Sequence, residues 1–360
     1  MIKDTIPQYS YEDLAIVPAV LSQIRSRKEC KILDLNGHLP LFTAPMSSVV
    51  DIVNYTKFEE NGIYAIIPRT ESIKVRLIKS NEVWCAFSLS EFEEHFVNNY
   101  ITEEDVVKKV VIDIANGHME YLYDLVRRAK GNNKGKLKIM VGNIANPLTY
   151  HECVKAKVDY VRLSIGSGFS CTTSSNVSIH YGCASLIDEV YKIKESYMLN
   201  GLNPPQIIAD GGVRNYSDII KALALGADYV MCGYIFAKMV ESAEIPFLYF
   251  KEGDENKEIS DILNDSEKVK EYIAEKRIFK KFYGMSTKIA QKMMGKEELV
   301  TSEGISRNIT VDYTMKGWID NFSDYLRSAM SYCDANCLEM FKGHTILVPL
   351  STNSFKLINK

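Results

Sequence analysis

The sequence predicts an α/β protein built as a (β/α)8 TIM barrel, on three observations. Eight short apolar runs are spread along the chain, most are separated by amphipathic helix-like segments, and the segments after the runs are small, polar and rich in glycine. Parallel strands need such crossovers, and barrels carry their chemistry at the carboxyl ends of the strands. A doubly wound sheet is the alternative. The 360 residues suffice for one large α/β domain or two ordinary ones.

The strands are predicted from apolar runs without strict alternation, as expected for strands buried on both faces. In chain order, the runs cover residues 39–45, 63–67, 83–89, 109–115, 137–142, 160–166, 206–210 and 229–234. The polar segments that follow them are where we expect ligand contacts.

Amphipathic segments between the runs predict the crossover helices. The clearest cover residues 146–158, 185–199 and 215–226. A closing helix is predicted over residues 321–341, and it would carry Cys333 and Cys337 four residues apart.

Two later stretches fall outside the eight units. Residues 247–280 are highly charged and predict a solvated insertion after the last strand. Residues 287–315 lack a clean period and predict a mobile flap over the rim. We therefore expect one barrel domain over residues 1–360, with the insertion and flap at 247–315.

The composition excludes several classes of protein. The net charge of −3 favours neither nucleic acid nor an anionic membrane as a partner. The first residues lack the apolar stretch of a signal peptide, and no run of membrane-spanning length occurs. The eight cysteines form no CxxC pair, which predicts a reduced, cytoplasmic protein with mostly buried thiols. The six histidines have no zinc-binding spacing.

The segment GSGFSCTT, after the sixth run, is the first candidate site. Gly166 and Gly168 allow a tight turn close to a ligand, and Cys171 in a strand-to-helix loop can act as a thiolate nucleophile. The competing interpretation is a polar loop with an incidental cysteine. After the seventh run, the DGG of residues 210–212 suits ribose hydroxyls and a phosphate, or is a plain turn.

These motifs together resemble the inosine-monophosphate dehydrogenase and GMP reductase family over almost the whole chain. Similar to the family, and in its order, are YEDLAIVP (11–18), APMSSV (44–49), GSGFSCTT (166–173), DGG (210–212), MCG (231–233), FYGMS (282–286), SEG (302–304) and RSAMSYC (327–333). The resemblance implies a (β/α)8 barrel, in agreement with the strand pattern, and a homotetramer.

The resemblance is stronger to the reductase branch. Dehydrogenases of the family usually carry a tandem CBS regulatory module after the second strand, whereas here only 15 residues separate Ile67 from Val83. Their flap carries an Arg-Tyr pair that activates water. The segment TKIAQKMMGKEELVT, between Ser286 and Ser302, has neither residue.

The resemblance implies NADPH-dependent reductive deamination of GMP to IMP and ammonia, through a covalent adduct between Cys171 and C2 of the purine. It implies Thr173 and Glu303 as the proton-transfer pair. It implies substrate contacts from Met46, Asp210, Gly211, Gly212, Gly233, Tyr283, Gly284, Met285 and Ser286. Cofactor contacts are implied for Arg69, Asp113, Ala115, Asn116 and Asn143. The carbonyls of Gly166, Gly168 and Cys171 resemble a potassium site.

Some positions depart from the family pattern. Phe169 replaces a phosphate-binding serine, and Tyr234 replaces a glycine or serine after the last strand. Ser47, Ser174 and the Gly182-Cys183 pair also differ. The alternatives are therefore an NAD-dependent IMP dehydrogenase without the regulatory module, a non-catalytic purine-nucleotide binder, and an enzyme for a different purine (deoxy)nucleotide or a ligand lacking the 5′-phosphate.

Overall fold

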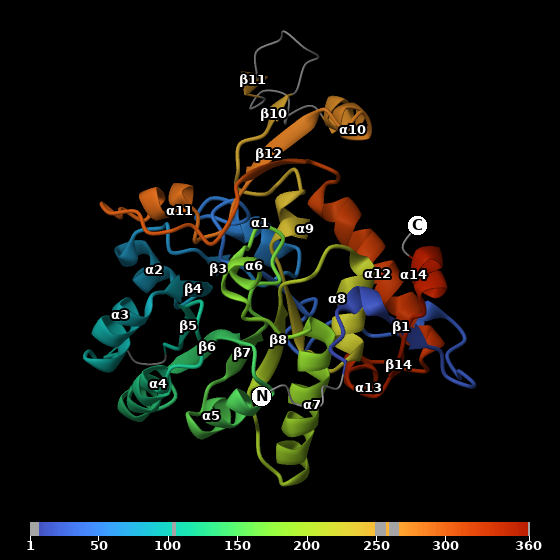
Figure 1. Ribbon diagram of the computed structural model, residues 1–360, viewed down its shortest axis with the longest axis horizontal. Helices are drawn as coiled ribbons and strands as arrows, with labels where there is room; N and C mark the ends of the chain where they lie inside the picture. Colours follow the sequence, from blue (N-terminus) through green and yellow to red (C-terminus); the bar gives the residue numbers. More distant parts are fainter. Residues whose placement is uncertain (1–6, 103–105, 249–256, 259–265, 359–360) are drawn as a thin grey trace.

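The computed structural model describes residues 7–102, 106–248, 257–258 and 266–358. One sheet of eight parallel strands has the order β2-β9-β8-β7-β6-β5-β4-β3, and a parallel bridge between Phe42 and Tyr64 connects its two edges. The predicted (β/α)8 barrel is thereby confirmed (Figure 1). Its strands are β2 Leu41–Thr43, β3 Ile66–Ile67, β4 Trp84–Phe87, β5 Lys108–Asp113, β6 Leu137–Ile144, β7 Tyr160–Leu163, β8 Gln206–Asp210 and β9 Tyr229–Cys232.

Each predicted run overlaps one strand, and helices follow the strands around the outside of the barrel (Figure 1). The three clearest predicted helices are found as η4 with α5, as α7 and as α8. The α-helices up to the last barrel strand are α1 Tyr55–Glu60, α2 Ile73–Lys79, α3 Leu89–Phe92, α4 Glu120–Asn133, α5 Tyr150–Lys155, α6 Thr173–Val177, α7 Cys183–Leu199 and α8 Tyr216–Ala224; α9 Tyr234–Ala237 comes after it. Shorter turns are η1 Tyr11–Asp13, η2 Arg27–Glu29, η3 Glu93–Val97 and η4 Pro147–Thr149.

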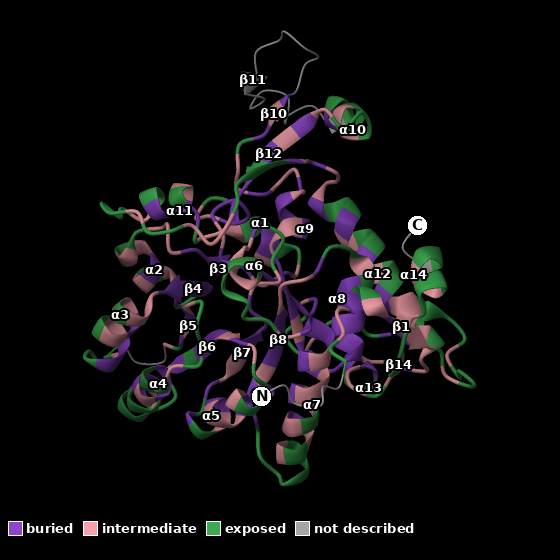
Figure 2. Cartoon of the chain, viewed as in Figure 1, coloured by how far each residue is buried: buried purple, intermediate pink, exposed green. Residues whose placement is uncertain are grey.

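Both faces of the barrel strands are buried, as the lack of polar alternation predicts (Figure 2). On β4, Trp84 and Ala86 belong to the cluster inside the barrel, while Cys85 and Phe87 pack in the layer between strands and helices. Adjacent residues thus feed two apolar cores, because side chains of a strand alternate between its faces. Because such strands are packed on both faces, they hold the loops at their carboxyl ends in fixed positions.

The charged insertion contains more structure than the sequence predicts. A four-stranded antiparallel sheet has the order β11-β10-β12-β13, and helix α10 lies beside it (Figure 1). Leu248, Ile278 and Val311 form a small buried core under this sheet. Residues 249–256 and 259–265 of the predicted insertion lie outside the described part. The elements are β10 Phe247–Leu248, β11 Lys257–Glu258, α10 Ser266–Ala274, β12 Ile278–Phe282 and β13 Arg307–Thr310.

The predicted flap contains helix α11, Lys288–Met293, between β12 and β13. Thr287 begins this helix, because its side chain accepts a hydrogen bond from the backbone of Ala290. Strand β12 precedes the flap and pairs with β13, which lies within it, so the insertion and the flap are continuous.

The predicted closing helix over 321–341 is wrong at both ends. Helix α12 covers Met315–Tyr332, with Thr314 as its cap, and the chain then turns before α13, Leu338–Phe341. Asp334 has a φ of 56°, which a continuous helix does not allow. Cys333 and Cys337 therefore flank a turn, and the remaining elements are β1 Leu14–Val17, which pairs with β14 Ile346–Pro349, and α14 Thr352–Ile358.

All eight cysteines are free thiols, and five of them are buried. This agrees with the prediction of mostly buried thiols. Among the described residues, none of the helices combines the length and the apolar content needed to cross a bilayer.

Candidate functional site

A cavity of about 480 Å³ lies at the carboxyl ends of the barrel strands, where the fold leads us to expect a site. The rim loops and the flap contribute its walls. It brings together all but two of the predicted site residues, although their positions in the sequence are far apart. Those lining it are Met46, Arg69, Asp113, Ala115, Asn143, Gly166, Gly168, Cys171, Thr173, Asp210, Gly211, Gly212, Gly233, Gly284, Met285, Ser286 and Glu303.

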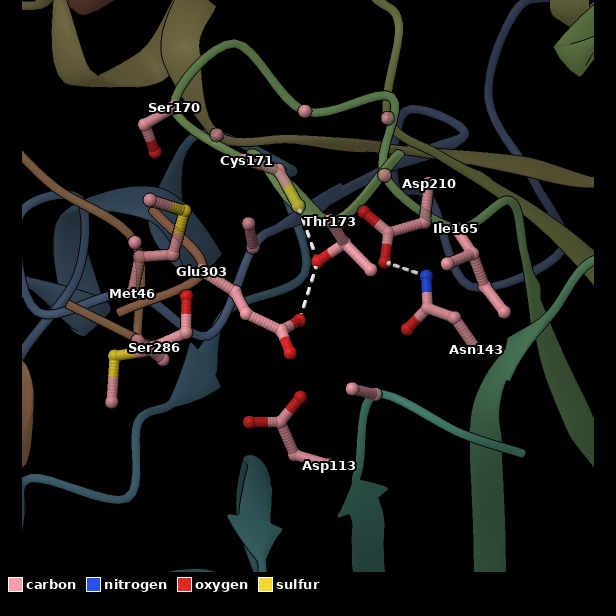
Figure 3. Close-up of a pocket in the computed structure, with 18 of the residues that line it drawn as sticks. Met46, Asp113, Asn143, Ile165, Ser170, Cys171, Thr173, Asp210, Ser286 and Glu303 are labelled. Carbon is pink, nitrogen blue, oxygen red and sulfur yellow. Dashed lines mark hydrogen bonds between the residues drawn. The ribbon is translucent and has the colours of Figure 1, made fainter. Parts of the chain in front are cut away.

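Three of these side chains form a continuous hydrogen-bonded chain (Figure 3). The Cys171 thiol donates to Thr173 Oγ1 at 3.2 Å, and the Thr173 hydroxyl donates to Glu303 Oε2 at 2.7 Å. A proton that leaves the thiol can therefore pass through the threonine to a carboxylate. A nucleophile and its base require a hydrogen-bonded route of this kind.

Backbone pairing between the two loops holds this chain of hydrogen bonds in place. The Thr172 N–H donates to the Glu303 carbonyl at 2.9 Å, and the Ile305 N–H donates to the Ser170 carbonyl at 2.8 Å. Cys171 and Gly304 thus lie opposite each other in an antiparallel bridge. Gly304 has little free space, since a Cβ there would lie 3.1 Å from the Ser170 carbonyl. The flap therefore places Glu303 directly beside the loop that carries Cys171.

The loop that carries Cys171 turns at Gly166, which has a φ of 74°. A Cβ at this position would lie 1.8 Å from Ser174 Oγ, so no other residue fits without moving α6. The Gly168 carbonyl accepts the Cys171 N–H at 3.0 Å. Because a carbonyl oxygen has two lone pairs, this bond leaves it able to bind a cation as well.

Arg162, which the sequence motifs did not single out, is a buried charge in the wall of the cavity. It lies on β7, is 6% exposed, and binds Asp113 Oδ1 at 2.8 Å and Asp210 Oδ2 at 2.9 Å. Burial lowers the pKa of Arg162, but the two carboxylates outweigh burial and raise it above its ordinary value. The feature of the sequence that could have indicated Arg162 is its position as a charged residue within an otherwise apolar strand.

Arg162 and Asn143 both orient Asp210. The Asn143 side chain donates to Asp210 Oδ2 at 2.8 Å (Figure 3). Within the described residues, the hydrogen bonds that we find on this carboxylate all reach Oδ2. Arg162 can take this position because residue 142 is a glycine. A Cβ at residue 142 would lie 2.4 Å from the Cβ of Arg162. Asp210 is thereby fixed while it still lines the cavity.

Two predicted site residues do not line the cavity. Tyr283 is 1% exposed, and its hydroxyl donates to Glu244 at 2.6 Å, so it is a buried support for the flap. Asn116 accepts the backbone N–H of His118 through its side chain in a local turn and is not among the residues that line the cavity. Their neighbours Gly284 and Ala115 do line the cavity, so the motifs lie in the right places.

Several residues of the cavity wall were not predicted as site residues. Phe169 and Tyr234 were singled out only as departures from the family pattern, and five flap side chains belong to no motif. The flap residues are Gln291, Met294, Lys296, Val300 and Thr301. Among the described residues, no group of three or more histidine, cysteine or acidic side chains forms a metal centre.

Comparisons with known proteins show the family to which the chain belongs. A family model described as "IMP dehydrogenase / GMP reductase domain" matches residues 8–357. The "GMP reductase" of Bacillus subtilis is 29% identical over 244 residues, 65% of this chain and 72% of its own length. That of Lactobacillus delbrueckii subsp. bulgaricus is 25% identical over 244 residues, 65% and 71% of the two chains. That of Oceanobacillus iheyensis is 26% identical over 283 residues, 76% and 79% of the two chains.

Proposed function

The chain belongs to the IMP dehydrogenase / GMP reductase family of oxidoreductases, and from this premise we propose that it reduces a guanine nucleotide, converting GMP to IMP and ammonia with NADPH. The observation that carries the proposal is the hydrogen-bonded chain from Cys171 through Thr173 to Glu303. It supplies a nucleophile and a proton route without a water-activating group.

In the proposed reaction, Glu303 takes the thiol proton through Thr173, and the Cys171 thiolate adds to C2 of the purine. The same pair returns a proton to the 2-amino group, which leaves as ammonia. NADPH supplies a hydride to C2. The carbon–sulfur bond then breaks, which releases IMP and the thiolate. Asp210, held by Arg162 and Asn143, binds the ribose hydroxyls.

The cofactor end of the cavity is supported by four of the five predicted residues. Arg69, Asp113, Ala115 and Asn143 line the cavity, and Arg69 donates to the Asp113 carbonyl at 3.2 Å. They offer hydrogen-bond donors and acceptors for the nicotinamide and its ribose. The cavity wall also includes the flap, whose residues between Ser286 and Ser302 include no arginine or tyrosine. The absence of these two residue types favours hydride transfer to C2 over hydrolysis of the Cys171 adduct at C2.

Potassium and the homotetramer belong to the same proposal and rest on the family resemblance, whereas the proposed cytoplasmic location rests on the eight cysteines without a CxxC pair. The carbonyls of Gly166, Gly168 and Cys171 would hold the cation, since hard oxygen ligands suit K⁺. Its role is tested by comparing turnover in potassium and sodium salts. Sedimentation analysis tests the tetramer.

The reaction is tested by following the absorbance of the reduced cofactor, with GMP plus NADPH in one assay and IMP plus NAD in another. We expect oxidation of NADPH with GMP. Cys171→Ala should abolish turnover, whereas Cys333→Ala, at the end of α12, should leave it unchanged. Reduction of NAD with IMP, and no oxidation of NADPH, would identify a dehydrogenase instead.

A further inference from the structure

Gln291 is a buried polar residue of the flap that no sequence motif singled out. It lies on α11, is 2% exposed and belongs to the wall of the cavity. A side-chain amide has two N–H donors and a carbonyl acceptor, and leaving such groups unpaired in a buried position is costly. The partners of the Gln291 amide therefore show what the side chain does.

The Gln291 amide joins the segment before α11 to the segment after it. Nε2 donates to the Ser286 carbonyl at 2.9 Å and to the Val300 carbonyl at 3.3 Å. Oε1 accepts the Val300 N–H at 2.9 Å. One side chain thus bonds both backbone groups of Val300 and connects them to Ser286.

The Ser286 end of this connection is held by other bonds as well. Thr287 donates twice to the Gly284 carbonyl, from its backbone N–H at 3.1 Å and from Oγ1 at 2.7 Å. The turn follows β12, which is paired with β10 and β13 in the insertion sheet. The Ser286 carbonyl is therefore a fixed point to which Gln291 attaches another segment.

The Val300 end depends on Gln291. Within the part of the chain that the structure describes, the hydrogen bonds that we find on the Val300 backbone both join it to the Gln291 side chain. Val300 is 58% exposed, so packing contributes little to its position. It lies three residues before Glu303. Without the amide, the segment that leads to Glu303 would lose its connection to Ser286.

The position of Glu303 is set by its backbone. Ser286 and Glu303 both line the cavity (Figure 3). Among the hydrogen bonds and ion pairs that we find in the described residues, the Glu303 carboxylate has one, from Thr173. After Glu303, the chain is held by the bond from Ile305 to the Ser170 carbonyl. Before Glu303, the corresponding support comes from Gln291.

We propose that Gln291 is a positioning residue for Glu303. Its amide holds the segment from Val300 to Glu303 against Ser286, which keeps the carboxylate within reach of the Thr173 hydroxyl. The inference rests on the proposed function for the chemical role of Glu303. It adds a residue that acts through Glu303, and a displacement of about 1 Å in such a group is enough to slow a reaction strongly.

The reactivity of Cys171 tests the inference without turnover. The rate of thiol exchange with a neutral dipyridyl disulfide is taken as the difference from the matched protein that also carries Cys171→Ala. Thiols react as thiolates, so a displaced proton acceptor slows the exchange. We expect Gln291→Met to slow it about fivefold or more at neutral pH, as Glu303→Gln does. In the double variant, the rate should stay within about twofold of Glu303→Gln alone, because Gln291 acts through Glu303.

Lys292→Met is the matched control, since Lys292 is the exposed neighbour of Gln291 on α11. It should exchange at the wild-type rate. An unchanged or faster exchange in Gln291→Met, or an effect of Gln291→Met that persists in the Glu303→Gln background, would overturn the inference.

Turnover separates this inference from the proposed function. With GMP and NADPH, we expect Gln291→Met to lower kcat about tenfold or more and to leave the KM for GMP within about threefold, because the proton acceptor moves while the turn at Ser286 remains. A higher KM with an unchanged kcat would assign Gln291 to binding and overturn its positioning role. If the wild-type protein reduces no GMP, the proposed function fails, and the exchange rates still decide the role of Gln291.

Gln291→Glu has nearly the same shape, but its ability to donate depends on pH. A neutral carboxyl can donate to one carbonyl and accept the Val300 N–H, whereas a carboxylate donates nothing. Burial and the facing carbonyls raise the pKa of the introduced carboxyl, so it is neutral in mild acid and charged in base. The exchange rate and the kcat, each relative to wild type, should therefore fall about fivefold or more from about pH 5.5 to about pH 8.5.

This comparison is made within one folded variant, so it holds even where Gln291→Met does not fold. Ratios to wild type that stay constant over the same pH range would show that the donors of Gln291 do not position Glu303.

Discussion

Thr173 is the residue through which the proposed proton transfer has to pass. Its hydroxyl accepts from the Cys171 thiol and donates to Glu303, so it has one bond on each side. Valine has the same shape without the hydroxyl, and it would interrupt the chain of hydrogen bonds with little change in volume.

We expect Thr173→Val to lower kcat by about 100-fold or more, because a positioned proton-transfer group contributes on that scale. Thr173→Ser should retain most of the rate, since the hydroxyl remains. The control is Thr172→Val, whose hydroxyl accepts only from Asn176 among the bonds that we find in the described residues. Steady-state kinetics measures all three. A Thr173→Val enzyme as fast as the Thr173→Ser enzyme would show that the proton takes another route.

Whether a site residue can be predicted depends on whether its chemistry needs a fixed local spacing. Cys171 and Thr173 lie two residues apart in one loop, and the GSGFSCTT motif predicts them. Arg162 acts through two carboxylates that only the closed barrel brings to it, at 48 and 49 residues along the chain. No local pattern records such an arrangement. Tyr283 is the opposite case, a predicted site residue that does not line the cavity. The FYGMS motif places the segment correctly, but the Tyr283 hydroxyl is hydrogen-bonded to Glu244.

At the scale of elements, Arg76 and Glu91 connect α2 to the start of α3. The Arg76 guanidinium binds Glu91 at 2.6 Å and also donates to the Ala86 carbonyl of β4 at 2.7 Å. Glu91 at the same time accepts the Ser88 N–H at 2.7 Å. Burial raises the pKa of Glu91, but the hydrogen bonds from Arg76 and Ser88 outweigh burial and lower it from 4.5 to about 2.

This pKa predicts a pH-dependent contribution to stability. Because the folded-state pKa is lowered, the stabilisation is present above about 4.5 and is lost as the pH falls toward 2. Glu91→Gln should reduce the free energy of unfolding by about 1–3 kcal/mol at pH 7, and the difference from wild type should shrink in acid. Urea unfolding at several pH values measures it.

Glu94→Gln is the matched control for this change, since the Glu94 side chain is 71% exposed. It should have little effect on the free energy of unfolding at any pH. If the loss of unfolding free energy in Glu91→Gln stayed constant from pH 7 to pH 3, the stabilisation would not come from the charge of Glu91.

The barrel strands were predictable because burial on both faces leaves a plain apolar run, as in Val110 to Ile112. The insertion sheet was not, since its small core rests on Leu248, Ile278 and Val311, which are scattered among charged residues. The ends of α12 were missed for a related reason. Thr314 begins the helix earlier than the apolar pattern suggests, and the turn at Asp334 depends on a backbone conformation.

At the scale of the whole molecule, Lys280 fastens the insertion sheet to the barrel. Its side chain is 1% exposed, and Nζ lies among oxygens of the segment that follows α9. These are the carbonyls of Met239 at 3.1 Å, Val240 at 2.7 Å and Ser242 at 2.8 Å, with Ser242 Oγ at 2.8 Å. The buried lysine thus donates hydrogen bonds to oxygens of this segment.

We expect Lys280→Met to lower the free energy of unfolding by about 2–4 kcal/mol, because the methionine keeps the bulk but removes the ammonium donor from the Val240 and Ser242 carbonyls. Thermal unfolding measures the change. Lys281→Met is the control, as Lys281 is its exposed neighbour on the same strand. Equal melting temperatures for the two variants would show that the ammonium does not join the parts.

The antiparallel bridge between Cys171 and Gly304 makes the reactivity of one thiol depend on a distant part of the chain. Glu303 lies 130 residues from Thr173 in the sequence, and its proton route exists only while that bridge is formed. Thiols react as thiolates. The rate at which an alkylating reagent modifies Cys171 therefore reports whether the flap is docked. In a chain whose barrel has folded but whose flap is not docked, Cys171 would lack its proton acceptor and would be inactive.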